Sequence, residues 1–514
     1  MLPEVVANAE HARLLEDGPA IPVRYGSRVV ETTENMNNAH IPARKLPQYV
    51  AALAATGGAL AAGTLLGWTS PTESLIVDKN GTEAKEYGFV VGDEAWSWVG
   101  SSTTLGAAIM CLFIGTIINL CGRKLTMLLL VIPFTIGWAL VIWASNIAML
   151  IVGRTLLGIS GGSFCICAPM YIGEIAQKDI RGTLGTFFQL MLTIGILFVY
   201  AVGSGASVFV LSIVCGCIPI IFAVIFVFMP ESPYYWVSKK QTEKAVASLK
   251  WLRGDNYDYN TELQELQSEH EERENSKISF AAAFARRTSV KALIIMLGLM
   301  FFQQMSGINA VIFYTGFIFD RANTGIQGSI ATIIVGVMQV IATFVSSIIV
   351  DKLGRRILLL ISVSVMALCT IVLGIYFYLS DQGNPNIDSL GWLPIVAMCV
   401  FIVVFSLGFG PIPWLMVGEI FPADVKGLAS SICGAFNWAL AFVITKTFTN
   451  IREAIGIGET FWLFSAFSVV GTVFVFFVVP ETKGKSLSDI QKMLAGEKPI
   501  NNDSDNHGVM DAKL

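Results

Sequence analysis

Apolar stretches of twenty or more residues recur along most of this sequence and constrain its fold more than any other feature. One long polar segment, Pro230 to Arg287, interrupts them and leaves six stretches on either side. A helix of about twenty apolar residues crosses the roughly 30 Å hydrocarbon core of a bilayer. The sequence therefore predicts an all-α membrane protein with twelve transmembrane helices in two six-helix bundles. The predicted spans are residues 47–68, 96–118, 125–145, 147–172, 183–203, 207–229, 291–319, 328–350, 357–379, 391–417, 427–449 and 460–480.

The composition agrees with a membrane protein and excludes several other classes. With 54% hydrophobic and 14% charged residues, the chain has too little polar surface for a soluble globule of 514 residues. A net charge of -4 gives no basic footprint for nucleic acid. The nine cysteines lie in or beside apolar stretches, and the four histidines lie in polar segments. We therefore predict no metal site, no cofactor and no enzymatic activity.

The polar segment in the middle predicts a cytoplasmic helical linker between the two bundles. Ser238, with Gln241 three residues later, fits a capping box at the start of a helix that Gly254 would end. A second helix is predicted from Asn260. The predicted domains are an N-terminal tail (1–46), a first bundle (47–229), the linker (230–290), a second bundle (291–480) and a C-terminal tail (481–514).

The distribution of lysine and arginine predicts the orientation. Twenty-eight of the 34 basic residues fall on the side of both termini, five fall on the opposite side, and Arg154 lies within a span. Cytoplasmic loops are the ones enriched in these residues, so both termini are predicted to be cytoplasmic in a multi-pass plasma-membrane protein. Asn80 begins a glycosylation sequon in the first outer loop. Glu10, Leu14 and Leu15 have the spacing of an acidic dileucine signal, which predicts a sorting adaptor as partner and an endosomal pool.

Charged motifs recur at matching points of the two halves. The matching pairs are Asn119–Lys124 with Asp351–Arg356, Gly173–Ile175 with Gly418–Ile420, and Pro230–Ser232 with Pro480–Thr482. Such a parallel duplication is typical of transporters whose halves rock about a central site. Opposite charges at the inner ends could then form a gate; alternatively, they anchor the helix ends at the headgroups. The predicted inner gate consists of Arg123, Arg154, Glu174, Arg181, Glu231, Arg355, Arg356, Glu419, Lys426 and Glu481.

Apart from Arg154 and residues at the ends, the spans contain few charged side chains but several amides. Neutral donors and acceptors suit a polyhydroxylated neutral solute, and the aromatic rings of Tyr314, Trp414 and Trp438 can cover the apolar faces of a sugar ring. Alternatively, an isolated amide bonds between packed helices. Gln303 and Gln304 lie close to Asn309, which favours a binding site. The amides are Gln189, Gln303, Gln304, Asn309, Gln339 and Asn437.

Five ordered motifs resemble the sugar porters of the major facilitator superfamily, the GLUT-type carriers. They are GRTLLG (153–158), PESP (230–233), QQMSGIN (303–309), GPIPW (410–414) and PETKG (480–484). The resemblance covers about residues 47–490 and implies the major facilitator fold. GWTSP at 67–71 and the run at 406–422 look more like insect facilitated trehalose transporters than mammalian glucose carriers. The resemblance implies a sugar site lined by Gln189, Gln303, Gln304, Asn309, Gln339, Trp414 and Asn437, with the repeated charges as the inner gate.

Three positions depart from the pattern that this resemblance implies. Thr69 stands where proton-coupled porters carry an aspartate, which favours uniport. Ser406 replaces a glutamate of the glucose carriers, and Tyr234 replaces the arginine usual after PESP. We therefore expect facilitative transport of a neutral sugar by alternating access, with trehalose the leading substrate. The alternatives are a hexose facilitator, a proton-coupled symporter and a transporter-like sugar sensor.

Overall fold

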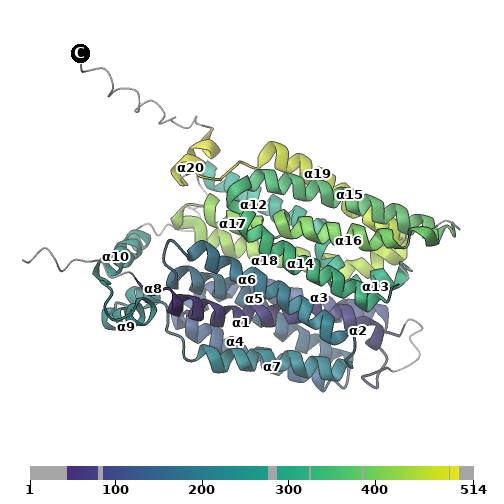
Figure 1. Cartoon of the computed structure of the whole chain (residues 1–514), viewed down its shortest axis with the longest axis horizontal. Coiled ribbons are helices and arrows are strands. Elements are labelled where there is room, and N and C mark those ends of the chain that lie inside the picture. The colour runs from purple at the N-terminus through teal and green to yellow at the C-terminus, as the bar shows by residue number, and fades with distance from the viewer. Residues whose placement is uncertain are drawn as a thin grey trace, which may run out of the picture. The chain divides into compact units, whose positions relative to one another are not determined.

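The computed structural model describes residues 43–78, 85–275, 286–322, 326–384, 387–485 and 487–496, and these residues form helices and their connections (Figure 1). Twelve of the helices are long and apolar enough to cross a membrane, and each corresponds to one predicted span. The all-helical fold with twelve spans is thus confirmed. Asn80, Glu10, Leu14 and Leu15 lie outside the described residues.

The first half supplies six of these membrane helices, the first of which continues directly into α2. Their elements are α1 (Leu46–Gly67), α2 (Thr69–Ile76), α3 (Asp93–Cys121), α4 (Arg123–Ile142), α5 (Ile147–Ile175), α6 (Arg181–Gly203) and α7 (Val208–Phe226). The second half supplies the other six. Their elements are α12 (Arg287–Met305), α13 (Ile308–Arg321), α14 (Gly328–Leu353), α15 (Arg355–Asp381), α16 (Trp392–Val404), the π-helical turn η3 (Phe405–Phe409), α17 (Pro411–Ile420), α18 (Ala423–Ile455) and α19 (Ile457–Val478).

Short helices gather at one end of the membrane helices, which we call the linker end; the opposite end is the far end (Figure 1). They are α8 (Pro233–Ser238), α9 (Thr242–Arg253), α10 (Asn260–Asn275) and α20 (Leu487–Ala495). The linker helices are tied to the first half, because the Arg253 guanidinium donates to the Ile175 carbonyl at 2.8 Å. Lys178 also pairs with Glu265 of α10 at 2.8 Å.

The predicted capping box in the linker is wrong. Ser238 is the last residue of α8, and its hydroxyl donates to the Tyr235 carbonyl at 2.7 Å. Helix α9 begins after Gln241, whose side chain makes no capping bond. Ser232 is the residue that caps a linker helix, since its hydroxyl accepts the Tyr235 N–H at the start of α8. The predicted stop at Gly254 is confirmed, and α10 begins at Asn260 as expected.

Glycine makes the same sharp connection in both halves. Gly122 joins α3 to α4 with a φ of 94°, and Gly354 joins α14 to α15 with a φ of 92°. Other residues rarely adopt this left-handed backbone. A Cβ atom at Gly122 would lie 2.4 Å from the Glu231 carboxylate, and one at Gly354 would lie 2.8 Å from that of Glu481. Each glycine therefore lets a carboxylate approach the turn.

Candidate sugar site and gating networks

Four of the predicted site amides form one hydrogen-bonded cluster. The Gln304 amide donates to the Asn437 side-chain oxygen at 3.0 Å, and the Asn437 amide donates to the Gln303 side-chain oxygen at 2.7 Å. Asn309 donates to the Gln304 oxygen. Gln303, Gln304 and Asn437 are buried, at 3%, 4% and 3% exposure, whereas Asn309 is half-buried. The cluster therefore presents neutral donors and acceptors without a fixed charge.

A break between α12 and α13 brings this cluster together. Gly307 has a φ of 84°, and a Cβ atom there would lie 2.5 Å from the Phe464 ring. Only glycine fits both the backbone conformation and the space. The chain turns at Gly307, so Asn309 at the start of α13 reaches back to Gln304 at the end of α12. The spacing of the QQMSGIN motif is thus the local cause of this part of the cluster.

The π-helical turn η3 and the glycine that follows it each supply one backbone acceptor to the cluster. Gln303 donates to the Phe409 carbonyl at 2.6 Å and to the Gly410 carbonyl at 3.1 Å. A π-helical turn leaves the ordinary helical hydrogen-bond ladder, and such turns are frequent at functional sites. Ser406 is buried in the same turn. The motif GPIPW therefore meets QQMSGIN through backbone carbonyls that the residue types alone do not reveal.

The other three predicted site residues lie outside this hydrogen-bonded cluster. Trp414 is 38% exposed, and its ring lies 3.8 Å from the Cβ position of Gly434, one turn from Asn437 on α18. Gln339 is buried on α14, one turn from Gly336, which packs against Leu197 of α6. Gln189 lies two turns before Leu197 on α6 and is half-buried. Within the described part of the chain, no hydrogen bond joins Gln189 or Gln339 to the cluster.

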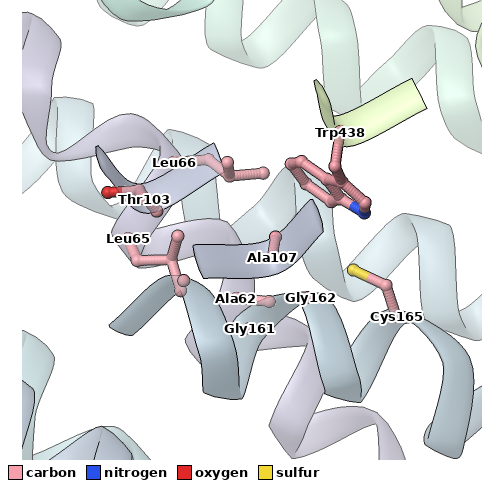
Figure 2. A pocket seen from close by; sticks show the side chains of 10 residues that line it. Ala62, Leu65, Leu66, Thr103, Ala107, Gly161, Gly162, Cys165 and Trp438 are labelled. Carbon is pink, nitrogen blue, oxygen red and sulfur yellow. The ribbon is translucent and has the colours of Figure 1, made fainter. Parts of the chain in front are cut away.

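Trp438, next to Asn437, closes a small pocket between the halves. Figure 2 shows its indole facing Leu66, Ala107 and Cys165 of the first half. The indole N–H is buried and has no hydrogen-bond partner among the described residues. Tyr314, the other aromatic residue considered for the sugar, is fully buried and donates to the Thr445 carbonyl at 3.2 Å.

The repeated charges at the linker end form the same network twice. In the first half, Arg123 donates two hydrogen bonds to Glu174, at 3.1 and 2.7 Å, and Ser232 donates to the other Glu174 oxygen. In the second half, Arg355 donates to Glu419 at 3.2 and 2.8 Å, and Thr482 donates to its other oxygen at 2.6 Å. The contacts match atom for atom, so the duplicated motifs fold into duplicated structure.

A second carboxylate in each network binds the backbone at the start of a helix. Glu231 accepts the N–H groups of Arg123 and Lys124, and Glu481 accepts those of Arg355 and Arg356, each at about 3.0 Å. Both therefore sit at a helix N-terminus, where the backbone favours negative charge.

Burial distinguishes these two carboxylates. It raises the pKa of Glu231, although the N–H groups of Ser232, Lys124 and Arg123 oppose the shift. Burial acts in the same direction on Glu481, but the N–H groups of Lys483, Arg355 and Arg356 outweigh it and lower the pKa. The first-half carboxylate is therefore the less readily ionised of the two.

Three further residues of the predicted gate make local contacts. Arg181 is exposed and donates to the Ala176 carbonyl at 3.3 Å, and Lys426 donates to the Gly418 carbonyl at 2.8 Å. Arg356 donates to the Phe476 carbonyl and lies over the Phe476 ring. Tyr234, the departure after PESP, places its ring 5.6 Å from the Arg123 guanidinium. The aromatic face therefore contacts Arg123 where the resemblance implies a second cation.

The assignment of Arg154 to the inner gate is wrong. It lies two turns into α5, which begins at the far end, and is 0% exposed. Its guanidinium donates to the Leu65 carbonyl at 2.9 Å and lies 5.0 Å from the Trp68 ring centre. One terminal nitrogen of the guanidinium has no partner among the described atoms. The charge of Arg154 therefore lies inside the first half, bonded to a backbone carbonyl.

Ion pairs that join the two halves were missed by the sequence analysis. Lys446 of α18 pairs with Glu94 of α3 at 2.8 Å, and Arg452 pairs with Asp93 at 3.4 Å. Among the described side chains, both ion pairs between the halves lie at this far end, whereas the networks above lie within one half each. The sequence contains a signal for these ion pairs, because two acidic residues, Asp93 and Glu94, begin α3 at an end that holds few lysines and arginines.

Backbone contacts also close the far end. The Tyr200 hydroxyl of α6 donates to the Ile312 carbonyl of α13 at 2.9 Å, and the Gly316 N–H donates to the Ser70 hydroxyl at 3.0 Å. Within the second half, the Arg452 guanidinium also lies 3.8 Å from the centre of the Phe317 ring. The two halves are therefore held together at the far end by polar contacts that span α2, α6 and α13.

Comparison with solved structures identifies the fold. The xylose transporter XylE from E. coli in an inward open conformation superposes with a TM-score of 0.70 at 24% identity, over 86% of this chain and 98% of that one. Its partially occluded inward open conformation gives a TM-score of 0.71 at 24% identity, over 86% and 99% of the two chains. The fold is that of a major facilitator transporter.

Sequence comparison identifies the family. Residues 50–494 match the family described as sugar (and other) transporter. The facilitated trehalose transporter Tret1 of Culex quinquefasciatus is 41% identical over 450 residues, 87% of this chain and 86% of that protein. The facilitated trehalose transporter Tret1-2 homolog of Drosophila simulans is 41% identical over 88% of this chain and 92% of its own length. The Tret1 of Anopheles gambiae is longer, and the match spans 56% of it. The chain belongs to the sugar transporter family of the major facilitator superfamily and is a transporter, not an enzyme.

Proposed function

We propose that this sugar transporter carries trehalose down its concentration gradient. The observation that carries the proposal is the amide cluster of Gln303, Gln304, Asn309 and Asn437, which offers neutral hydrogen-bonding groups beside the indole of Trp438. Relatives named facilitated trehalose transporters, 41% identical over most of the chain, favour this disaccharide. A hexose is the second candidate, because the same amides suit the hydroxyl groups of any neutral sugar.

The surroundings of Arg154 support transport without proton coupling. The Leu65 carbonyl that binds this guanidinium lies one turn before Thr69. Thr69 is buried, and its hydroxyl faces the Leu66 carbonyl at 3.5 Å. A threonine cannot bind or release a proton near neutral pH, so this position supplies no proton carrier beside the buried arginine.

The different contacts at the two ends support alternating access. The far-end contacts between the halves must break before that end opens. Each linker-end network lies within one half and stabilises that half in this structure. We propose that Arg123, Glu174, Glu231 and their second-half counterparts exchange partners across the seam when the linker end closes. A double-mutant cycle on Arg123 and Glu419 in an outward-facing state would measure zero coupling if this exchange does not occur.

We propose that the linker end is cytoplasmic and that the protein resides in the plasma membrane. Asn80 would then be outside the cell and carry a glycan. Replacing Asn80 by glutamine should convert the slower-migrating gel species into a single faster one that glycosidase no longer shifts. Asn502→Gln is the matched control, because Asn502, Asp503 and Ser504 form a second sequon that would lie in the cytoplasm. A glycosidase-sensitive species that persists in Asn80→Gln would contradict the orientation.

Uptake by purified protein in liposomes tests the substrate and the mode of transport. Labelled trehalose should enter until its concentrations inside and outside are equal, with or without an imposed proton gradient. Protein-free liposomes measure the leak. Uptake of glucose but not of trehalose would favour a hexose facilitator. Sugar accumulation driven by the proton gradient would contradict uniport. An absence of flux of either sugar would favour a sensor.

A further inference from the structure

A groove runs along the lipid-facing side of the first half between α4 and α7, two helices that lie side by side (Figure 1). Leu128, Ile132 and Ile136 line it from α4, and Val224 of α7 and Val227, just after α7, line the other side. Its volume is about 670 Å³, within the roughly 300–1,000 Å³ of typical ligand sites. Thr135, a polar residue in the lining, already donates to the Val131 carbonyl at 2.9 Å. The groove therefore suits a hydrocarbon chain.

The groove opens to the bilayer. Ile132 and Val224 are 57% and 61% exposed, and both lie in membrane-spanning helices. A helix surface at this depth contacts acyl chains, because no water is present in the hydrocarbon core. We therefore expect a lipid acyl chain in the groove. The residues at the end of the groove determine which headgroup binds with it.

Lys124 lies at the linker end of this groove. Residues four apart share one face of a helix, so Lys124 precedes Leu128, Ile132 and Ile136 along the same stripe of α4. It is the second residue of its span, at the level where headgroups begin. Within the described residues, its ammonium group has no hydrogen bond or ion pair. Glu231 acts on it electrostatically, but the Glu231 oxygens already accept three backbone N–H groups.

The second half provides an internal comparison. Arg356 follows Gly354 and Arg355 as Lys124 follows Gly122 and Arg123. Its guanidinium donates to the Phe476 carbonyl of α19 and lies 5.7 Å from the centre of the Phe476 ring. In the second half, Arg356 thus binds the neighbouring helix α19. In the first half, Lys124 has no such partner among the described residues.

We propose that the α4/α7 groove and Lys124 bind one anionic glycerophospholipid from the leaflet at the linker end. One acyl chain lies in the groove and the phosphate contacts Lys124. A cation near a membrane surface favours an anionic headgroup by about 1 kcal/mol, so the preference for phosphatidylserine over phosphatidylcholine should be roughly fivefold. The site is independent of which sugar the protein carries.

Native mass spectrometry of the purified full-length protein tests the headgroup contact. The probes are phosphatidylserine and phosphatidylcholine with identical acyl chains, added in equal amounts. Wild type should retain phosphatidylserine in roughly fivefold excess, and Lys124→Gln should retain both equally. Lys352→Gln is the matched control, since Lys352 is an exposed lysine at the linker end of the other half and should keep the preference. An unchanged preference in Lys124→Gln would overturn the proposal, as would equal retention by wild type.

A second variant tests the groove itself. Val224→Trp places a bulky ring in the groove and should reduce retention of both lipids, with Lys124 intact. Thermal unfolding in detergent shows whether the variant remains folded. A folded Val224→Trp protein that retains phosphatidylserine like wild type would refute the acyl-chain site. If that variant unfolds, Val224→Phe, which introduces a smaller ring, replaces it in the same lipid-retention experiment, and the same outcomes decide.

Discussion

Replacing Gln304 by alanine is expected to lower sugar uptake roughly 5- to 150-fold while the amount of protein in the membrane stays unchanged. The substitution removes an amide that donates to Asn437 and accepts from Asn309. It leaves two buried or half-buried polar groups without that partner, and it deletes donors available to the sugar. One sugar hydroxyl left without its partner costs about 1–3 kcal/mol, and 1.4 kcal/mol is about a factor of ten in binding.

The measurement is initial-rate uptake together with binding of the same sugar to purified protein. Gln48→Ala is the matched control, because Gln48 is also a fully buried glutamine and exchanges hydrogen bonds with Gln177, yet it lies at the linker end of α1. That variant should bind sugar with wild-type affinity. Undiminished uptake by Gln304→Ala would remove this residue from the site, and equal loss in both variants would indicate a general effect on folding.

Hydropathy predicted every span, because a bilayer demands long apolar helices and the chain has few other apolar segments. It missed α2, since Ser70, Thr72 and Glu73 lower the hydropathy of a segment that is nevertheless buried. The α12–α13 break, in contrast, follows from one glycine. Local sequence therefore fixes element type well, while the burial of a polar segment depends on neighbours that are distant in sequence.

The members of the amide cluster were named from the sequence, but their hydrogen bonds were not. Gln303 and Gln304 are adjacent, yet Asn437, which joins them, is more than 130 residues away. The linker-end charges were recognised through the duplication, but their partners belong to the same half. Arg154 was misplaced although the predicted topology already puts the start of the 147–172 span at the far end. Residue spacing in the sequence predicts which residues belong to a network, whereas the packing of the helices decides which of these residues pair.

Replacing Glu174 by alanine is expected to destabilise the first half by about 3–5 kcal/mol. The Arg123 side chain is 3% exposed, and its guanidinium donates both of its hydrogen bonds to Glu174. Without this carboxylate a buried cation loses its counter-charge, and Ser232 loses its acceptor. Thermal unfolding of purified protein measures the change, and Glu174→Gln should lose less stability because it keeps an acceptor for Arg123.

Because the network occurs in both halves, comparing its two copies can distinguish a stabilising role from a gating role. Arg355 and Glu419 are more exposed, at 10% and 24%, so Glu419→Ala should cost less stability than Glu174→Ala. Arg181→Gln removes an exposed guanidinium with one long backbone bond and should leave stability unchanged. If Glu174→Ala kept wild-type stability but altered the rate of transport, the network would act only as a gate. Lost stability with proportionate loss of transport would instead place it among the contacts that hold each half rigid while the halves move.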